Sequence, residues 1–242
     1  MKRPLRLVAL LMPLLALLVL ASPVSAAPTR VDVLPAVEEF SSARYDFALT
    51  LFGVEVGYGK GEVESVDRVH VTLKTVASAE SPSDTFESIL YDGVLYTRTN
   101  DSTQWYIEEG PNTGVTPPSP EEDDTSDVAL SLIGPVDVAG VATNQYQVWQ
   151  NDAEVASTAD FFIGTSRSLL HKLQISAYAI DGTDLIPVLG LDYRFFDFDA
   201  SDIKVYPPTN AIRQTNAAAY GTSGWAIRSA PLSLSAWLSV VR

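Results

Sequence analysis

The feature that most constrains this chain is an apolar residue at every second position over long stretches. Every second residue from Tyr45 to Leu51 is large and apolar, and the residues between them are smaller or polar. Similar alternation occurs in residues 69–77, 169–180 and 188–198. A period of two places one set of side chains on one face of a β-strand, so these segments predict half-buried strands.

Turn residues separate the predicted strands. Asp92-Gly93 and Asp181-Gly182 each follow an apolar run, which is typical of tight hairpins. Further short strands are predicted over residues 86–91, 94–98, 104–107, 144–149 and 159–163. Glycines at positions 53, 57, 59 and 61 predict a strand that bends or is closely approached by a neighbour. The chain therefore reads as mainly β, with one antiparallel sheet in a single domain.

Two short helices are expected as exceptions. One could begin after Pro35, within an N-terminal segment over 27–42. The other follows a proline-rich, acidic loop over 110–127, because Ser126 can cap a helix that Gly134-Pro135 would stop. This second helix is the candidate lid, with the residues Val128, Leu130, Leu132 and Ile133.

The first 26 residues are typical of a secretory signal peptide. Lys2, Arg3 and Arg6 precede an apolar run from Leu7 to Leu20, and small residues end at Ala26. The apolar run is shorter than the roughly 20 residues that a membrane-spanning helix needs. We therefore expect cleavage after Ala26 and a protein that works outside the cytoplasm, in the periplasm, the cell envelope or the extracellular space, with no stable membrane span.

Composition narrows the possible partners. The chain has no cysteine, which excludes disulfides, thiol catalysis and the lipid attachment of bacterial lipoproteins. Its net charge is −14, and the first 26 residues hold three basic and no acidic residues, so the rest carries −17. Such acidity argues against nucleic acid and against anionic lipid surfaces as partners.

A search for catalytic or cofactor motifs finds none. The two histidines, His70 and His171, lie on different predicted strands without the spacing of metal ligands. The glycine-rich stretch 57–61 lacks the spacing of a phosphate-binding loop, and the acidic run 121–124 does not fit a calcium loop. We expect no enzyme, no cofactor and no metal site.

Two segments resemble the LolA-like carriers and their mycobacterial relatives of the LppX/LprG type. The first is the hairpin from Tyr91 to Ile107, in which Asp-Gly is followed by Tyr-Thr-Arg and then by Trp105. The second is the run from Tyr193 to Pro208, with its Phe-Asp-Phe element. The resemblance spans about 43–208 and leaves the tail 209–242 without a counterpart. It implies an open, strongly curved antiparallel half-barrel with helices over the concave face, and binding of lipid or lipoprotein acyl chains.

The apolar face of the sheet has two interpretations, an ordinary core or the wall of a ligand cavity. The hypothesis favoured here is a non-enzymatic carrier or chaperone for lipid or acylated protein. Its tentative cavity lining is Phe47, Leu49, Leu51, Leu73, Phe86, Leu90, Tyr96, Trp105, Phe161, Leu173, Ile175, Leu191 and Phe195. The alternative is an envelope sensor or interaction module, which would bind a protein partner through the apolar residues 231–241.

Overall fold

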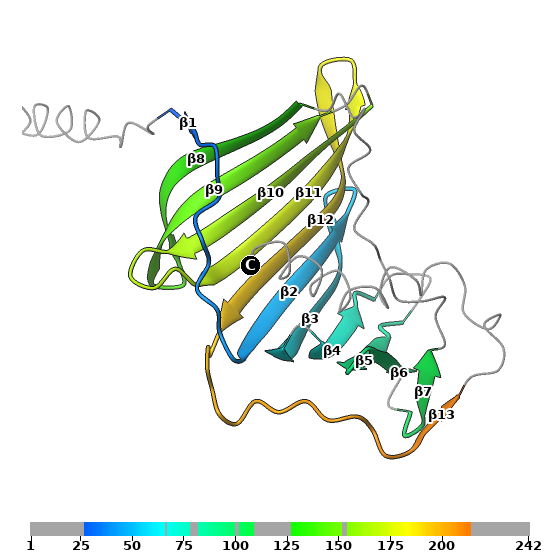
Figure 1. Cartoon of the computed structure of the whole chain (residues 1–242). Helices are drawn as coiled ribbons and strands as arrows, with labels where there is room; N and C mark the ends of the chain where they lie inside the picture. Colours follow the sequence, from blue (N-terminus) through cyan, green and yellow to red (C-terminus); the bar gives the residue numbers. More distant parts are fainter. Residues whose placement is uncertain are drawn as a thin grey trace, which may run out of the picture.

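The computed structural model describes residues 27–65, 67–77, 82–99, 102–108, 127–151 and 154–213. The predicted signal peptide, the acidic run 121–124 and the apolar residues 231–241 lie outside these residues. Thirteen strands form a single sheet in the order β1-β8-β9-β10-β11-β12-β2-β3-β4-β5-β6-β7-β13. Figure 1 shows the strands side by side, with β2 near the middle of the sheet.

The strands are long where the alternation is long. Their bounds are β1 Thr29–Arg30, β2 Ala43–Leu51, β3 Val54–Ser65, β4 Arg68–Thr75, β5 Thr85–Tyr91, β6 Val94–Thr99, β7 Trp105–Glu108, β8 Asp127–Val138, β9 Val141–Asn151, β10 Val155–Gly164, β11 Leu170–Asp181, β12 Asp184–Phe196 and β13 Ala211–Arg213. All neighbours are antiparallel except β13, which pairs with β7 in parallel. The prediction of a mainly β, antiparallel domain is confirmed.

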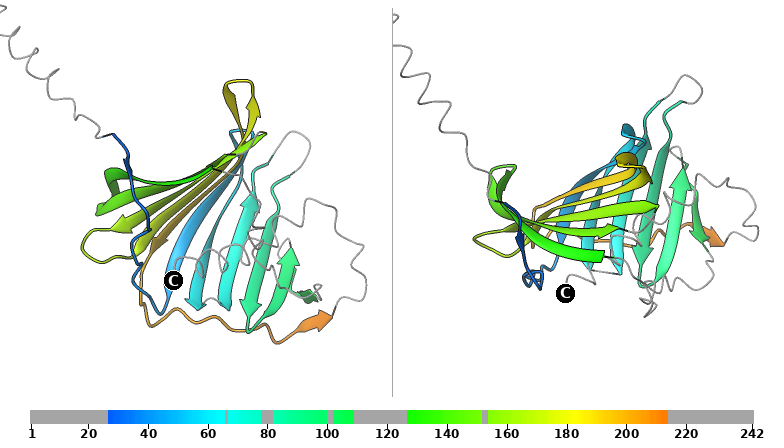
Figure 2. Two further views of the ribbon diagram at one scale, coloured as in Figure 1. Left: turned by 45° about the horizontal axis from the view of Figure 1, so that its top comes forward. Right: turned by 90° about the horizontal axis from the view of Figure 1, so that it is seen from above.

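The curvature and the helices of the predicted half-barrel are not found. The sheet is open and is neither closed nor strongly curled (Figure 2). The described residues contain no helix. Substantial contacts between strands join only sheet neighbours, so no described strand forms a second layer.

The predictions of two short helices are both wrong. Val128, Leu130, Leu132 and Ile133, the expected lid, lie in β8, which pairs with β9 along its length. Gly134 and Pro135 do not stop a helix; the register of β8 shifts between Leu132 and Gly134, and the strand continues. Such a bulge lets a strand bend without ending. Residues 31–42 are also not helical, although Leu34, Val37 and Phe40 do pack against the core.

The core lies on one face of the sheet, which we call the apolar face. It runs from β10 through β11, β12, β2, β3 and β4 to Leu90 on β5. In one of its rows Tyr193 stands between Leu173 on β11 and Phe47 on β2. Four aromatic rings, from Tyr45, Phe47, Tyr193 and Phe195, contact one another with centroids 5.6 to 6.3 Å apart. Such ring contacts add to the free energy gained from burial.

Glycines on β3 make room for these rings. A Cβ at Gly59 would lie 2.5 Å from the ring of Phe47, and one at Gly61 would lie 2.3 Å from the ring of Tyr45. The rings of β2 therefore lie directly on the backbone of β3. This confirms the close approach that the run of glycines predicts.

The chain leaves β12 and returns along one end of the sheet to its far edge. Ile203 and Val205 are buried on this path, and Val205 packs with Ile89 and Trp105 in a second, smaller cluster. The path ends in β13, beside β7 (Figure 1). The smaller cluster lies on the opposite face of the sheet from the main core, because Ile89 alternates with Leu90 on β5.

Candidate functional site

Two adjoining hollows lie on the polar face of β11, β12 and β2, where β8 and β9 form a hairpin. Their volumes are about 490 Å³ and about 510 Å³, the size of ordinary ligand pockets. They share four lining residues, which are Asp46, Val138, Ala139 and Arg194. The hollows therefore form one continuous depression around the end of the hairpin.

The hairpin end is built by a tight turn. Ala139 and Gly140 have φ angles of 52° and 85°, the left-handed pair that a two-residue hairpin turn requires. The Asp137 carboxylate accepts a hydrogen bond of 2.8 Å from the amide of Gly140. Val138 is buried although it stands next to the turn. The bend in β8 thus places an apolar hairpin end, rather than a helix, over this part of the sheet.

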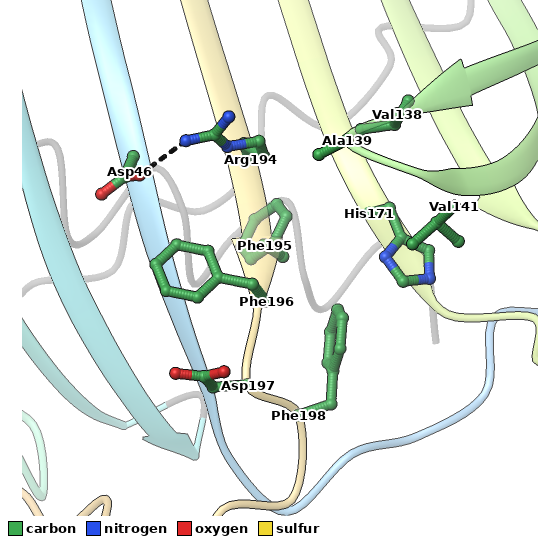
Figure 3. A pocket seen from close by; sticks show the side chains of 10 residues that line it. All are labelled: Asp46, Val138, Ala139, Val141, His171, Arg194, Phe195, Phe196, Asp197 and Phe198. Carbon is green, nitrogen blue, oxygen red and sulfur yellow. Dashed lines mark hydrogen bonds and ion pairs between the residues drawn. The ribbon is translucent and has the colours of Figure 1, made fainter.

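The first hollow is seen from close by in Figure 3. Phe196 and Asp197, at the end of β12, lie across from Val141 and His171. Phe198 closes the lower side, and its ring packs edge-on against His171 with centroids 5.2 Å apart. Aromatic and aliphatic side chains therefore surround most of this hollow.

Two ion pairs lie at the hollows, which the carboxylates of Asp137 and Asp197 also line. The Arg194 guanidinium lies 2.9 Å from the Asp46 carboxylate, and the Lys172 ammonium lies 2.8 Å from that of Asp192. Lys172 also lies over the ring of Phe162, 5.4 Å from its centroid. Each cation already has a carboxylate partner, so these four groups together add no net charge.

The turn after β12 is fixed by further ion pairs. Arg44 bonds to Asp197 at 3.1 Å and to Asp202 at 2.8 Å. The amide of Ser41 donates a 2.8 Å hydrogen bond to the Asp199 carboxylate, and this bond, with the nearby Arg167, lowers the pKa of Asp199. The position of Phe198 is therefore set by contacts on both sides of it in sequence.

His171 is the titratable group of the first hollow with a shifted pKa. Burial lowers its pKa, and the positive charge of Arg167 lowers it further. Its imidazole is thus favoured in the neutral form, which suits an apolar surrounding.

The predicted cavity residues are placed in three groups. Nine belong to the core of the apolar face or pack against it: Phe47, Leu73, Phe86, Leu90, Phe161, Leu173, Ile175, Leu191 and Phe195. Tyr96 and Trp105 belong to the smaller cluster. Leu49 is half-buried, and Leu51 is 39% exposed at the end of β2. Of all thirteen, Phe47 and Phe195 line the hollows; a cavity on the apolar face stays a prediction.

Sequence reasoning missed most of the residues that line the hollows. Phe162 and Phe196 lie at strand positions that alternate with residues of the main core, and Val138 lies at the end of β8, which contributes no residue to that core. A possible signal was the pair of adjacent aromatic residues in Phe161-Phe162 and Phe195-Phe196, which places a ring on each face of β10 and β12.

A separate cluster of charged groups lies on β4, β5 and β6. The Glu87 carboxylate lies 2.7 Å from His70 Nε2 and pairs with Arg98, whose guanidinium lies 4.6 Å from the ring centroid of Trp105. Burial raises the pKa of Glu87, but hydrogen bonds from His70 and Arg98 outweigh it and leave the pKa below its usual value. Among the described residues no group of three or more His, Cys, Asp or Glu could hold a metal ion.

Because of this cluster, we expect the free energy of unfolding to fall in acid. Because the folded-state pKa of Glu87 is lowered, its contribution is present above the unfolded value of about 4.3 and is lost as the pH falls through the folded pKa. We expect Glu87→Gln to cost about 1 to 2 kcal/mol at pH 7. Urea unfolding at pH 7, 5 and 3 should show the difference from the unmodified protein shrinking below pH 5. A difference that stays constant to pH 3 would contradict the assignment.

No helix in the described part of the chain is long and apolar enough to cross a membrane. No protein-family model matches the chain, and a search of curated proteins finds no match.

Two solved structures show a loose likeness to this sheet. A DUF1329 family protein from Desulfovibrio piger is 9% identical, with a TM-score of 0.25 over 68% of this chain and 88% of that one. A LolA superfamily protein from Nitrosomonas europaea is 8% identical, with a TM-score of 0.26 over 72% of this chain and 89% of that one. A LolA superfamily protein is thus among the structures with a loose likeness, but at TM-scores this low neither structure says what this chain binds.

Proposed function

We propose that the protein is a non-enzymatic carrier that binds the acyl chain of a lipid or of an acylated protein outside the cytoplasm. The observation that carries this proposal is the pair of joined hollows beside the β8–β9 hairpin. Aromatic and aliphatic side chains form most of the first hollow, and the second combines such side chains with the charged residues Asp46, Asp137, Lys172, Asp192 and Arg194. That combination is typical of sites for small apolar ligands.

The apolar part of the ligand should dominate its affinity. Arg194 and Lys172 are each already paired with a carboxylate, so a ligand head group would have to compete with Asp46 or Asp192. By contrast, each methylene that leaves water contributes about 0.8 kcal/mol. Selectivity should therefore follow chain length more closely than the charge of the head group.

The location outside the cytoplasm is supported by the signal-peptide pattern of the first 26 residues. The lack of cysteine supports a protein that is released rather than anchored by a lipid. A carrier of this kind would exchange its cargo with membranes or with envelope proteins.

Blocking the hollow tests the proposal. Ala48 lines the second hollow from β2, and we expect Ala48→Trp to weaken binding of a fluorescent fatty acid at least tenfold. The matched control is Ser176→Trp on β11, which faces the same side of the sheet as Lys172 but lines neither hollow. The control should stay within twofold of the unmodified protein, and circular dichroism should show both variants folded.

Competition with saturated fatty acids of 8, 10 and 12 carbons provides the second measurement. Each added pair of methylenes should tighten binding about tenfold until the hollows are filled. No binding of any of these fatty acids, or equal loss in Ala48→Trp and Ser176→Trp, would disprove this site.

A further inference from the structure

Apolar side chains are exposed together at the end of the sheet opposite the hollows. On the β2–β3 hairpin, Phe52 is 71% exposed and Val54 is 65% exposed, next to Leu51. On the β11–β12 hairpin, Leu185 and Ile186 are both more than 40% exposed. We call these five residues the apolar tip. Both hairpins point toward the same end of the sheet in Figure 1.

The two hairpins are fixed side by side. The amide of Phe52 donates a 3.0 Å hydrogen bond to the carbonyl of Val188 on β12, and Leu51 stands opposite Leu189. A side chain at Gly53 would begin 3.6 Å from Cγ of Pro187. The turn of the β2–β3 hairpin is therefore held against β12 at residues 187–189, directly after Leu185 and Ile186 in the sequence.

The backbone at Phe52 shows that an exposed phenylalanine there has a cost. Its φ of 51° is the left-handed conformation, which the two-residue turn with Gly53 requires. Asn, Asp and Gly adopt that conformation readily, whereas a bulky aromatic residue is strained in it. The chain thus carries a strained residue whose ring is left in water, although asparagine would relieve both costs.

The shape and charge of the apolar tip fit a lipid surface. Its side chains stand at the ends of protruding hairpins, and no described hollow lies among them, so they can enter a soft apolar layer. Exposed carboxylates of Glu55, Asp181 and Asp184 flank it, and Lys74 on β4 is the nearby base. A mainly acidic rim is repelled by anionic lipids, whereas a zwitterionic headgroup has no net charge and does not repel it.

We propose that the apolar tip docks the protein on zwitterionic membrane surfaces, with Phe52 and Leu185 entering the layer below the headgroups. This inference does not depend on what the hollows bind. The nearest hollow residues to the tip are Ala48, four residues from Phe52 along β2, and Asp192, seven residues from Leu185 along β12. At 3.3 Å per residue these separations are roughly 13 Å and roughly 23 Å. Each can therefore be impaired without the other.

Phe52→Asn is the decisive variant, because asparagine suits the left-handed turn and the protein should fold at least as stably as before. The mature protein, residues 27–242, would be sedimented with sucrose-loaded phosphatidylcholine vesicles. We expect Phe52→Asn to weaken vesicle binding at least tenfold and the double variant with Leu185→Ser to abolish it. The matched control is Tyr206→Ser, which removes a side chain that is 69% exposed at the other end of the sheet and should change binding less than twofold.

Two further measurements separate the outcomes. Replacing half of the phosphatidylcholine by phosphatidylglycerol should weaken binding of the unmodified protein, because the rim is acidic. Phe52→Asn should take up the fluorescent fatty acid normally, whereas Ala48→Trp should bind vesicles normally. Unchanged vesicle binding by Phe52→Asn would overturn the proposal. So would light scattering that shows a dimer lost in Phe52→Asn, since the tip would then be an interface between two copies of the chain.

Discussion

Substituting Gly59 by alanine is expected to destabilise the protein by about 3 kcal/mol, a large part of the 5 to 15 kcal/mol that a domain typically has. The new Cβ would lie 2.2 Å from the carbonyl oxygen of Thr72 and 2.5 Å from the ring of Phe47. The first contact is with the backbone of β4, so rotation of a side chain cannot relieve it. The strands would have to separate, or the substitution would unfold the middle of the sheet.

Urea unfolding followed by tryptophan fluorescence would measure this effect. Gly57→Ala is the matched control on the same strand, since its Cβ would meet the flexible end of Leu73 at 3.2 Å and the carbonyl oxygen of Lys74 at 3.3 Å. It should cost clearly less than Gly59→Ala. Adding Phe47→Leu to Gly59→Ala should cost less than the sum of the two single changes, because it removes one of the two clashes. Equal losses for Gly57→Ala and Gly59→Ala would show that the rings do not rest on β3 in solution.

The strands could be predicted because their signal is local. Alternation from Tyr45 to Leu51 and from Leu169 to Ile180 depends on one face of the sheet being apolar, and the structure places β2 and β11 at these positions. Asp92-Gly93 forms the predicted hairpin turn, with both residues at positive φ. The close approach at Gly59 and Gly61 was also visible, because glycine at every second position leaves one face of a strand without side chains.

The path of β8 could not be predicted in the same way. Ala-Leu-Ser-Leu-Ile-Gly-Pro, at positions 129–135, has a capping serine before it and a glycine and proline after it, all of which favour a short helix. Pairing with β9 overrides this local preference, and the bulge at Leu132 and Gly134 accommodates the two helix-breaking residues within a strand. Long-range pairing of this kind leaves no signature within the segment itself.

The site was harder to predict than the fold for a related reason. Apolar positions on a strand identify its buried face, and they led to the main core rather than to the hollows. Apart from Phe47 and Phe195, the strand residues that line the hollows include Phe162 and Phe196 on the opposite face, which stand among charged residues such as Lys172 and Arg194. Their importance depends on the hairpin end at Val138 and Ala139, which only the three-dimensional path of the chain brings near them.

Substitutions of Phe161 and Phe162 test which face of the sheet holds the ligand cavity. Phe161 is 3% exposed on the apolar face and stands between Tyr146 and Leu173 on the neighbouring strands. If this region is packed core, Phe161→Ala should cost about 3 to 5 kcal/mol, the range for deleting a buried aromatic ring. Unfolding by urea would give this value, and uptake of the fluorescent fatty acid by the folded fraction should stay unchanged.

Phe162→Ala is the matched control, with the same change one residue later on the opposite face. Phe162 is also buried, at 6% exposed, but its ring lines the second hollow beside Lys172, so we expect a loss at the lower end of the same range, about 3 kcal/mol. Uptake of the fluorescent fatty acid should change by several-fold, because the shape of the proposed site changes. The opposite outcome has two parts. Phe161→Ala would cost under 1 kcal/mol and would alter uptake of the fatty acid, whereas Phe162→Ala would cost more than 1 kcal/mol and would leave this uptake unchanged. The ligand would then bind on the apolar face, among the residues that the alternation of the sequence predicts, and the hollows beside the β8–β9 hairpin would be surface depressions without a ligand.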